Sequence, residues 1–460
     1  MKTPKKVLRY VEENMQEVLH TTLNPEGPGV IRIHLIPPKC EAGEVASSIA
    51  IINGQDIVPV NTSWSILLSE FIREVNTYNG REITEEDGKV ILENTCKRVR
   101  KVYTLLSKKI IKRDLYTIME TFSDIARGKV PKEPVDYISL GDYAPYMRAP
   151  HRMDLLVSAM VKDGKWHCNQ NCIHCYAAGQ ELVSEEELST EEWKRIIDKC
   201  RQVCIPQVTF TGGEPTMRED LFELIDYASF FVTRLNTNGI RLTEAYCKKL
   251  MESSLDSCQI TFYSCEEAIH NTLVGAPQYE KTLAGIENAV KAGLNVSINT
   301  PLCTLNRDYV KTLEFLHQKG ILYVTCSGLI TTGNACTEQS EALQLTSEEM
   351  EALFKEAIEY CHANGMEISF TSPGWVGDEL FDTYGLAKPV CGACLSNMAV
   401  TPGGNVVPCQ SDLNGEPLGN MLRDDWESIW NHPDCELHRA YSARQTGECP
   451  LRRRKANEEK

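Results

Sequence analysis

The sequence predicts an α/β protein organised around a parallel β-sheet. Between residues 152 and 365, short β-rich apolar runs alternate with helical patterns, and this alternation is typical of βαβ units in a parallel sheet. Polar and cysteine-containing motifs directly follow several of the apolar runs. Because the carboxyl ends of parallel strands meet at one edge, we expect these motifs to gather there and to form the functional site.

Length and charge narrow the class of protein. A chain of 460 residues with 42% hydrophobic side chains is long enough for two or three domains with large cores. No apolar stretch is as long as the ~18 residues of a membrane span, and no apolar signal core follows the N-terminal lysines. The net charge of −16 argues against a nucleic-acid partner, and Arg452–Lys455 is interpreted as a solvated basic tail. We therefore expect a cytoplasmic protein with neither a membrane nor a nucleic-acid partner.

The cysteine content is high, at 19 residues. In a chain without an export signal, this number indicates thiols that stay reduced, some of which hold metal. Oxygen attacks both thiolates and exposed clusters. An anaerobic or well-reduced cytoplasm is therefore the expected environment.

The first 135 residues predict a small α+β domain. A β-hairpin is expected over Val45–Val60, with its turn at Asn53-Gly54. Three helical patterns follow, at Ile66–Val75 with Asn61 as its N-cap, at Thr84–Ser107 and at Leu115–Ala126. Residues 136–151 are proline-rich without a helical period, so they are interpreted as a linker.

Residues 152–365 contain six predicted strand–helix units, which imply a parallel sheet. The strands are expected at Leu155–Val161, Gln207–Thr211, Phe231–Asn236, Ser257–Ser264, Asn295–Pro301 and Leu322–Ser327. The helices are expected at Thr190–Cys204, Asp220–Ser229, Glu244–Ser253, Tyr279–Lys291, Asp308–Gln318 and Ser347–Asn364.

Three cysteines follow the first predicted strand at C-x3-C-x2-C spacing: Cys168, Cys172 and Cys175. Three thiolates on one tight loop can hold three irons of a [4Fe–4S] cube and leave the fourth iron open to a small molecule. The alternatives are a zinc site, which usually has four ligands when it is structural, or three unrelated thiols.

Two further motifs end later strands, Gly212-Gly-Glu-Pro215 and Asn236-Thr-Asn-Gly239. With the cysteine motif, and in this order, they resemble the radical S-adenosylmethionine (SAM) superfamily. The resemblance implies a partial (β/α)6 TIM-like barrel in which the open iron binds SAM. It also implies that Glu214 holds the amino group of SAM through a charge-assisted bond, beside glycines that let the backbone approach the ligand. The further cofactor-binding residues that it implies are Tyr176, Gly212, Gly213, Pro215, Asn236, Thr237 and Asn238.

The fourth unit, Cys258–Ser264 with His270 and Gly275, resembles the subgroup that carries a C-terminal SPASM or twitch extension. This resemblance implies that Thr261 faces SAM, and the fifth strand end likewise places Asn299 at SAM. The chain departs from the pattern at Asn271, where aspartate is usual. It departs again at Val274, where some relatives have arginine, so no arginine contact to SAM is expected.

The region 366–460 carries Cys391-Gly-Ala-Cys394, then Gly403–Cys409, Leu418-Gly-Asn420 and a Trp426–Trp430 segment. This order resembles a SPASM or twitch domain. It implies an auxiliary [4Fe–4S] cluster held by Cys391, Cys394, Cys409 and Cys449, with Cys435 competing for the place of Cys449 or Cys391. The single late cysteine favours a twitch-like domain with one auxiliary cluster; a zinc ribbon is the alternative.

Three more cysteines end predicted strands, Cys265, Cys303 and Cys326. Thiols at strand ends can face a substrate cavity. Free cysteine is also a common small buried hydrophobe, and this is our interpretation of all three.

The resemblance implies an enzyme that reductively cleaves SAM to methionine and a 5′-deoxyadenosyl radical, which abstracts hydrogen from the substrate. Cleavage needs no general acid or base, so no catalytic side chain is expected beyond the binding sites. Flavodoxin or ferredoxin is the expected electron donor.

The N-terminal pattern resembles the winged-helix domain with which peptide-modifying members bind the leader of a precursor peptide. We therefore expect a ribosomally made peptide as substrate, modified by thioether or carbon–carbon crosslinking or by epimerisation. A packing domain without a ligand is the alternative for this region. For the whole chain, the alternatives are a small molecule or a folded protein as substrate, as in sulfatase-maturing members, or an iron–sulfur electron carrier or sensor. A carrier would not need the Gly-Gly-Glu-Pro segment.

Overall fold

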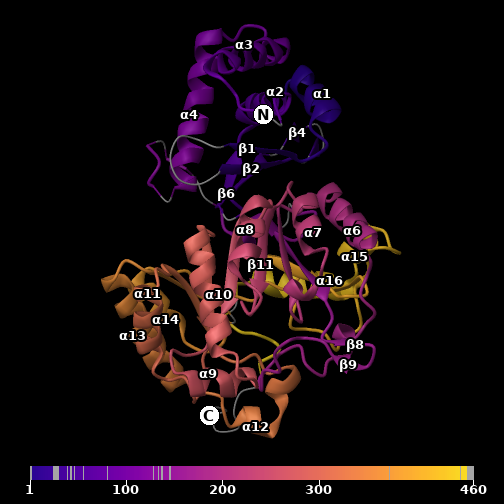
Figure 1. Ribbon diagram of the computed structural model, residues 1–460. Helices are drawn as coiled ribbons and strands as arrows, with labels where there is room; N and C mark the ends of the chain where they lie inside the picture. Colours follow the sequence, from indigo (N-terminus) through magenta and orange to yellow (C-terminus); the bar gives the residue numbers. More distant parts are fainter. Residues whose placement is uncertain are drawn as a thin grey trace. The chain divides into compact units, whose positions relative to one another are not determined.

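The computed structural model describes residues 3–452, apart from 24–30, 39, 42, 43, 46, 55, 80, 128, 133, 136, 137, 145, 146, 372 and 446. Residues 453–455 of the predicted basic tail lie outside this range. The chain forms two compact units, Met1–Arg148 with Arg201–Pro206, and Ala149–Cys200 with Gln207–Lys460 (Figure 1). The boundary expected at residue 366 falls inside the second unit.

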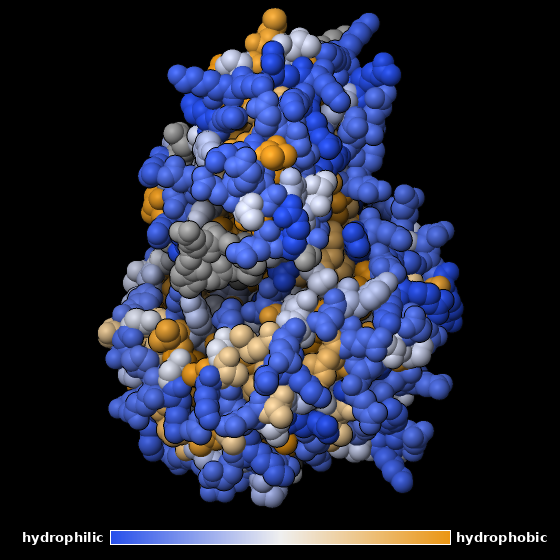
Figure 2. All heavy atoms as spheres, turned by 45° about the horizontal axis from the view of Figure 1, so that its top comes forward, coloured by the Kyte–Doolittle hydropathy of each residue, from blue (hydrophilic) through white to orange (hydrophobic). Residues whose placement is uncertain are grey.

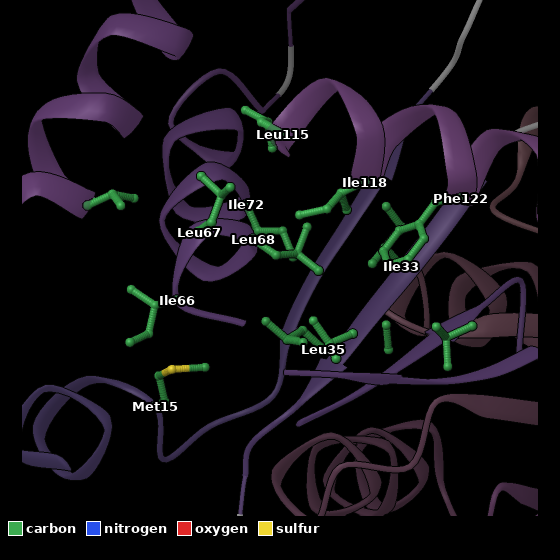
Figure 3. Packing of buried hydrophobic residues seen from close by; sticks show 14 of the residues in the cluster. Met15, Ile33, Leu35, Ile66, Leu67, Leu68, Ile72, Leu115, Ile118 and Phe122 are labelled. Carbon is green, nitrogen blue, oxygen red and sulfur yellow. The ribbon is translucent and has the colours of Figure 1, made fainter. Parts of the chain in front are cut away.

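The first unit combines an antiparallel sheet with helices. Its strands are β1 (Leu19–Leu23), β2 (Ile31–Ile36), β5 (Ser48–Ile52) and β6 (Asp56–Val60), in the order β1-β2-β5-β6. The helices are α1 (Lys5–Asn14), α2 (Thr62–Asn76), α3 (Glu85–Val102) and α4 (Lys108–Ala126), and two-residue strands β3 (Cys40–Glu41) and β4 (Glu44–Val45) form a separate pair. Side chains of β2, α2 and α4 meet in one buried core, with Ile33 and Leu35 facing Leu68 and Phe122 (Figure 3).

The hairpin and the three helices are confirmed, with changes at their edges. Asn53 takes a left-handed φ of 49° at the turn, and Asn61 caps α2 by accepting from the Trp64 amide at 3.0 Å. Helix α4 begins at Lys108 and not at Leu115, because Ser107 caps it by accepting from the Ile110 amide at 3.3 Å. Helix α1 and strands β1 and β2 were not expected from the sequence.

The second unit is built on a ten-stranded sheet, in the order β15-β14-β13-β12-β11-β10-β7-β16-β17-β18. Its first seven strands are parallel: β7 (Arg152–Ser158), β10 (Gln207–Gly212), β11 (Val232–Thr237), β12 (Ser257–Thr261), β13 (Val296–Pro301), β14 (Tyr323–Ser327) and β15 (Glu367–Phe370). The helices that follow them are α6 (Thr190–Gln202), α7 (Leu221–Tyr227), α8 (Glu244–Glu252), α10 (Tyr279–Ala292), α11 (Tyr309–Gln318) and α13 (Ser347–Ala363), arranged around the strands (Figure 1). The six predicted strand–helix units are thereby confirmed.

The first strand differs from its prediction, which was Leu155–Val161. Strand β7 starts at Arg152 and ends at Ser158. Val161 instead pairs with Trp166 in a small hairpin of β8 (Val161–Lys162) and β9 (Lys165–Trp166). The turn residues Asp163 and Gly164 have φ values of 51° and 70°, a conformation that aspartate and glycine tolerate. This hairpin leads into the first cysteine motif.

The C-terminal region continues the same sheet. Strand β16 (Asn397–Val400) runs parallel to β7, with Asn397 opposite Arg152. Strands β17 (Asn405–Val407) and β18 (Gly419–Asn420) extend it antiparallel. Helices α14 (Asp378–Tyr384), α15 (Trp426–Trp430) and α16 (Pro433–Ala443) complete this region. The visible face of the molecule is largely hydrophilic (Figure 2). None of the helices in the described residues combines the length and the apolar character needed to cross a bilayer.

Candidate functional site

The first cysteine motif forms a tight, largely buried loop. The Cys175 amide donates to the carbonyl of Cys172 at 3.1 Å, and the Cys168 thiol donates to the Gly213 carbonyl at 3.3 Å. Burial raises the pKa of Cys168 to about 12 and raises the pKa of Cys172 and Cys175 as well. Each of these thiols would lose its proton on binding iron, so metal insertion has to overcome this preference for the neutral form.

A helix that the sequence analysis did not predict holds one side of this loop. Helix α9 (Glu267–Val274) ends in Gly275, which has a left-handed φ of 65°. The amides of Asn171 and Ile173 donate to the carbonyls of Val274 and Leu273, both at 3.1 Å. A Cβ at Gly275 would lie 2.2 Å from the Asn171 carbonyl oxygen, so only glycine permits this close approach.

A second segment, residues 332–340, holds the other side. The Asn334 amide donates to the Cys175 carbonyl at 2.9 Å, and its side-chain amide donates to the Cys172 carbonyl at 3.2 Å. Ser340 donates to the Ile173 carbonyl at 2.8 Å. These contacts join residues more than 150 positions apart in the chain, and no local sequence signal predicts them.

Glu214 ties two strand ends together. Its carboxylate is 1% exposed. Oxygen Oε1 accepts from the Thr216 amide at 3.1 Å, the Thr216 hydroxyl at 2.5 Å and the Thr237 hydroxyl at 2.6 Å. Oxygen Oε2 accepts from the Asn238 amide at 2.8 Å. Burial raises the pKa of Glu214, and these donors oppose that rise. Only Oε2 retains capacity for another donor, such as an ammonium group.

Asn238 connects this pair of strand ends to the cysteine loop. Its side-chain amide donates to Oδ1 of Asn169 at 2.6 Å. Glycines 212 and 213 also have a packing role. A Cβ on Gly212 would lie 2.4 Å from the Ser158 carbonyl oxygen, and one on Gly213 would lie 2.8 Å from that of Ala159. The close approach that requires glycine is therefore to the end of β7. Pro215 is buried and opens a short 3-10 turn.

A cavity of about 620 Å³ brings the two cysteine regions together. Of the predicted site residues, its lining includes Cys172, Cys175, Tyr176, Asn236, Thr261, Asn299, Cys391, Cys409 and Cys449. The other predicted residues are not among those that line it: Cys168, Gly212, Gly213, Glu214, Pro215, Thr237, Asn238 and Cys394. The Tyr176 carbonyl accepts from the Thr332 hydroxyl at 3.2 Å and from the Gln180 side-chain amide at 2.5 Å.

Three of the four cysteines expected to hold an auxiliary cluster line the cavity. Burial raises the pKa of Cys409 to about 12, and Cys449 and Cys391 lie close enough to raise it further. The Ser442 hydroxyl donates to the Cys391 sulfur at 3.6 Å. Cys391, Cys409 and Cys449 therefore lie near one another in the cavity wall.

Cys394 and Cys435 form a separate pair. Cys394 is fully buried, with a left-handed φ of 55°, and its thiol hydrogen-bonds to that of Cys435. This bond lowers the pKa of Cys435, as does the guanidinium of Arg439, which donates to its sulfur at 3.4 Å. Cys394 also lies close enough to Cys409 for the two sulfurs to interact.

Across the described part of the chain, no three His, Cys, Asp or Glu side chains converge on one point that a metal ion could occupy. Cys303 and Cys326 are fully buried, and neither they nor Cys265 line the cavity.

Family models match two parts of the chain. Residues 167–317 match the model described as the radical SAM superfamily, and residues 391–452 match SPASM, described as an iron–sulfur cluster-binding domain. These ranges contain both cysteine regions of the cavity. They confirm the resemblance inferred from the motifs.

Curated relatives and solved structures agree with these matches. The chain is 26% identical to mycofactocin maturase MftC of Mycolicibacterium smegmatis over 61% of this chain and 72% of that protein. It is 32% identical to an AdoMet-dependent heme synthase of Oleidesulfovibrio alaskensis, over 44% of this chain and 53% of that protein. The crystal structure of Streptococcus suis SuiB bound to precursor peptide SuiA superimposes with a TM-score of 0.56 at 13% identity, covering 86% of this chain and 88% of SuiB.

Proposed function

The chain belongs to the radical SAM superfamily and carries a SPASM domain; from this we propose that it cleaves SAM to generate a 5′-deoxyadenosyl radical that takes a hydrogen atom from its substrate. Its cofactors are SAM and [4Fe–4S] clusters. The observation that carries the proposal is the single cavity lined by Cys172 and Cys175 together with the barrel strand ends. Cys168, Cys172 and Cys175 would hold a [4Fe–4S] cluster, which would supply the electron for cleavage when bound.

The residues around this cluster position SAM and exclude water. In this proposal, Oε2 of Glu214 accepts from the SAM ammonium while Oε1 stays bound to the two threonines. Asn236, Thr261 and Asn299 present polar atoms at successive strand ends along the cavity wall. Asn299 is itself oriented, because it accepts from the Thr325 hydroxyl at 2.8 Å.

Cys391, Cys394, Cys409 and Cys449 are the proposed ligands of an auxiliary cluster. Three of these thiols line the cavity, and Cys394 lies near Cys409. Cys435 already accepts from Arg439, which favours leaving it outside the ligand set.

The substrate class that we propose is a ribosomally made peptide. The support is the likeness to a mycofactocin maturase and the fold match to SuiB, whose structure includes a precursor peptide. That match covers 86% of the chain, too much to lie in the second unit alone, which holds about two thirds of the residues. A small-molecule substrate is the second candidate, favoured by the likeness to heme synthases.

The first unit is proposed to bind the leader of that peptide by strand addition. Strand β6 is an edge of the four-stranded sheet. Pro59 offers no N–H on it, and the Ile57 carbonyl accepts from the Ile138 amide at 3.4 Å. A leader would have to displace this last contact. The opposite edge is also partly occupied, since Asn76 donates to the His20 carbonyl of β1 at 2.8 Å.

The test uses anaerobically reconstituted protein with dithionite. Wild type should cleave SAM to 5′-deoxyadenosine and carry about eight irons, four per cubane. The Cys168→Ala/Cys172→Ala/Cys175→Ala variant should retain about four irons and lose cleavage; continued cleavage would overturn the proposal. Iron without any 5′-deoxyadenosine in wild type would indicate an electron carrier or sensor.

The peptide is tested with short precursors encoded beside the gene. Removal of residues 1–135 should leave 5′-deoxyadenosine formation intact and weaken peptide modification. If the truncated enzyme modified the peptide at the wild-type rate, the first unit would have a structural role and would not bind the leader.

A further inference from the structure

One cation in the cavity forms no ion pair at bonding distance. Arg234 lies on β11 and lines the cavity, half-buried. Among the described residues, its guanidinium makes no hydrogen bond, and the Asp154 carboxylate acts on it only at longer range. Burial and the nearby Arg152 cation lower its pKa to about 10, and Asp154 opposes this shift. Arg234 therefore remains protonated near neutral pH.

The other cations of the lining are already neutralised. Arg152 donates from Nε and Nη2 to both oxygens of Asp154, at 2.8 and 3.2 Å. Lys388 pairs with Asp378 at 3.2 Å and Asp382 at 3.0 Å. The described lining contains no aspartate or glutamate. Arg152, Asp154 and Arg234 together thus carry one net positive charge, in a chain whose net charge is −16.

A hydroxyl without a partner lies beside this cation. In the sheet register, Thr209 of β10 is paired with Arg234 of β11 on one side and with Asp154 of β7 on the other. Thr209 is 2% exposed and lines the cavity, yet its Oγ1 has no hydrogen-bond partner. Buried polar groups normally have partners, and so do buried cations. Two adjacent groups that lack partners and share a cavity indicate a missing anion.

Arg234 lies deeper in the barrel than the strand ends proposed to bind SAM, so an anion bound to it would lie apart from SAM. Arg234 precedes Thr237, which contacts Glu214, by three residues on the same strand. At a strand rise of 3.3 Å per residue, the Cα of Arg234 lies about 10 Å deeper in the barrel than the Cα of Thr237. A molecule anchored there extends towards the strand ends and the cysteine loop.

Resting on the proposed function, we propose that Arg234 and Thr209 bind a carboxylate of the substrate. A guanidinium accepts a carboxylate through two parallel bonds, and one net positive charge matches one carboxylate better than a phosphate dianion. The carboxylate belongs either to a peptide, as an acidic side chain or a C-terminus, or to a small organic acid. The anchor fixes which C–H bond of the substrate reaches the radical.

The test measures binding by anaerobic calorimetry to full-length, reconstituted enzyme with SAM. The probes are acetyl-Ala-Asp-Ala-amide, its Asn analogue, acetyl-Ala-Ala-Ala with a free C-terminus, succinate, succinamide and inorganic phosphate. Wild type should bind at least one carboxylate probe about tenfold or more tightly than its neutral analogue, as a lost charge-assisted bond implies. Arg234→Gln should remove this preference and Arg234→Lys should retain part of it. Lys388→Gln, a paired cation of the same lining, should keep it.

Several results would decide the matter. Equal affinity for charged and neutral probes would overturn the proposal, as would a preference that persists in a folded Arg234→Gln variant. Tighter binding of phosphate than of succinate would also overturn it. Binding of succinate but of neither peptide would uphold the carboxylate site and count against a peptide substrate. Failure of the proposed function would appear separately, as absence of 5′-deoxyadenosine.

Discussion

Replacing Glu214 by glutamine tests the link between the second and third strand ends. The amide would keep Oε1 facing Thr216 and Thr237, because three donors converge on that oxygen. Its NH2 group would then face the Asn238 amide, whose present bond to Oε2 measures 2.8 Å. Two donors facing each other leave that N–H without an acceptor in a buried place.

The expected cost follows from this lost acceptor. A buried unsatisfied N–H costs about 1–3 kcal/mol. A loss of ~2 kcal/mol lowers Tm by roughly 5 °C at about 2–4 °C per kcal/mol for domains of 150–250 residues. Removing the negative charge should also weaken SAM binding by about tenfold, the value of a charge-assisted bond. Asn238 would lose its anchor, and with it the contact to Asn169 on the cysteine loop.

The assay compares Glu214→Gln with Glu185→Gln by melting temperature, SAM affinity and 5′-deoxyadenosine formation. Glu185 is a matched control, since its carboxylate also accepts backbone and side-chain donors, from Gly403 at 3.1 Å and Asn405 at 2.6 Å. It does not line the cavity. Both variants should melt earlier, and only Glu214→Gln should bind SAM more weakly. Unchanged SAM affinity in a destabilised Glu214→Gln variant would show that Glu214 only joins the strand ends.

Two further predictions concern the clusters. Gly275→Ala places a Cβ 2.2 Å from the Asn171 carbonyl oxygen and should disturb the first cysteine loop. Iron analysis should then show about four irons where wild type has about eight. The control Gly293→Ala, with a φ of 83° and no atom within 4 Å of the new Cβ, should keep all of them. Cys394→Ser should lose the auxiliary iron and Cys435→Ser should retain it, since Arg439 already occupies the Cys435 sulfur; iron retained in both variants would make the two thiols a structural pair.

The sequence predicted the barrel well because its signals are local. Each strand–helix unit carries its own apolar run and caps, such as the Thr346–Glu349 capping box of α13, and the six units lie within a few residues of their expected bounds. The first cysteine motif was found for the same reason. The spacing of Cys168, Cys172 and Cys175 is visible within ten residues of the chain.

The parts that the sequence did not predict depend on distant partners. Strand β16 is only four residues long, and its place beside β7 depends on a parallel register with the far end of the chain. The roles of Asn334 and Gly333 likewise depend on carbonyls of the cysteine loop. Arg234 resembles any polar residue in a strand until the cavity and its neighbours are known. Gly212 and Gly213 were predicted as site residues, but their closest contacts are with β7 and could not be inferred from the motif.

The position of β7 has a consequence for how this chain matures. Among the described residues, one side of β7 pairs with β10 and the other pairs with residues 397–400. During synthesis, that second side stays open until these residues leave the ribosome, and parallel pairing over such a distance is slow. An open strand edge is a template for association with other chains. Arrival of β16 both covers this edge and adds Cys391 and Cys409 to the cavity wall. A chain shortened before residue 397 would therefore leave this edge of β7 open and would lack Cys409 and Cys449 in the cavity wall.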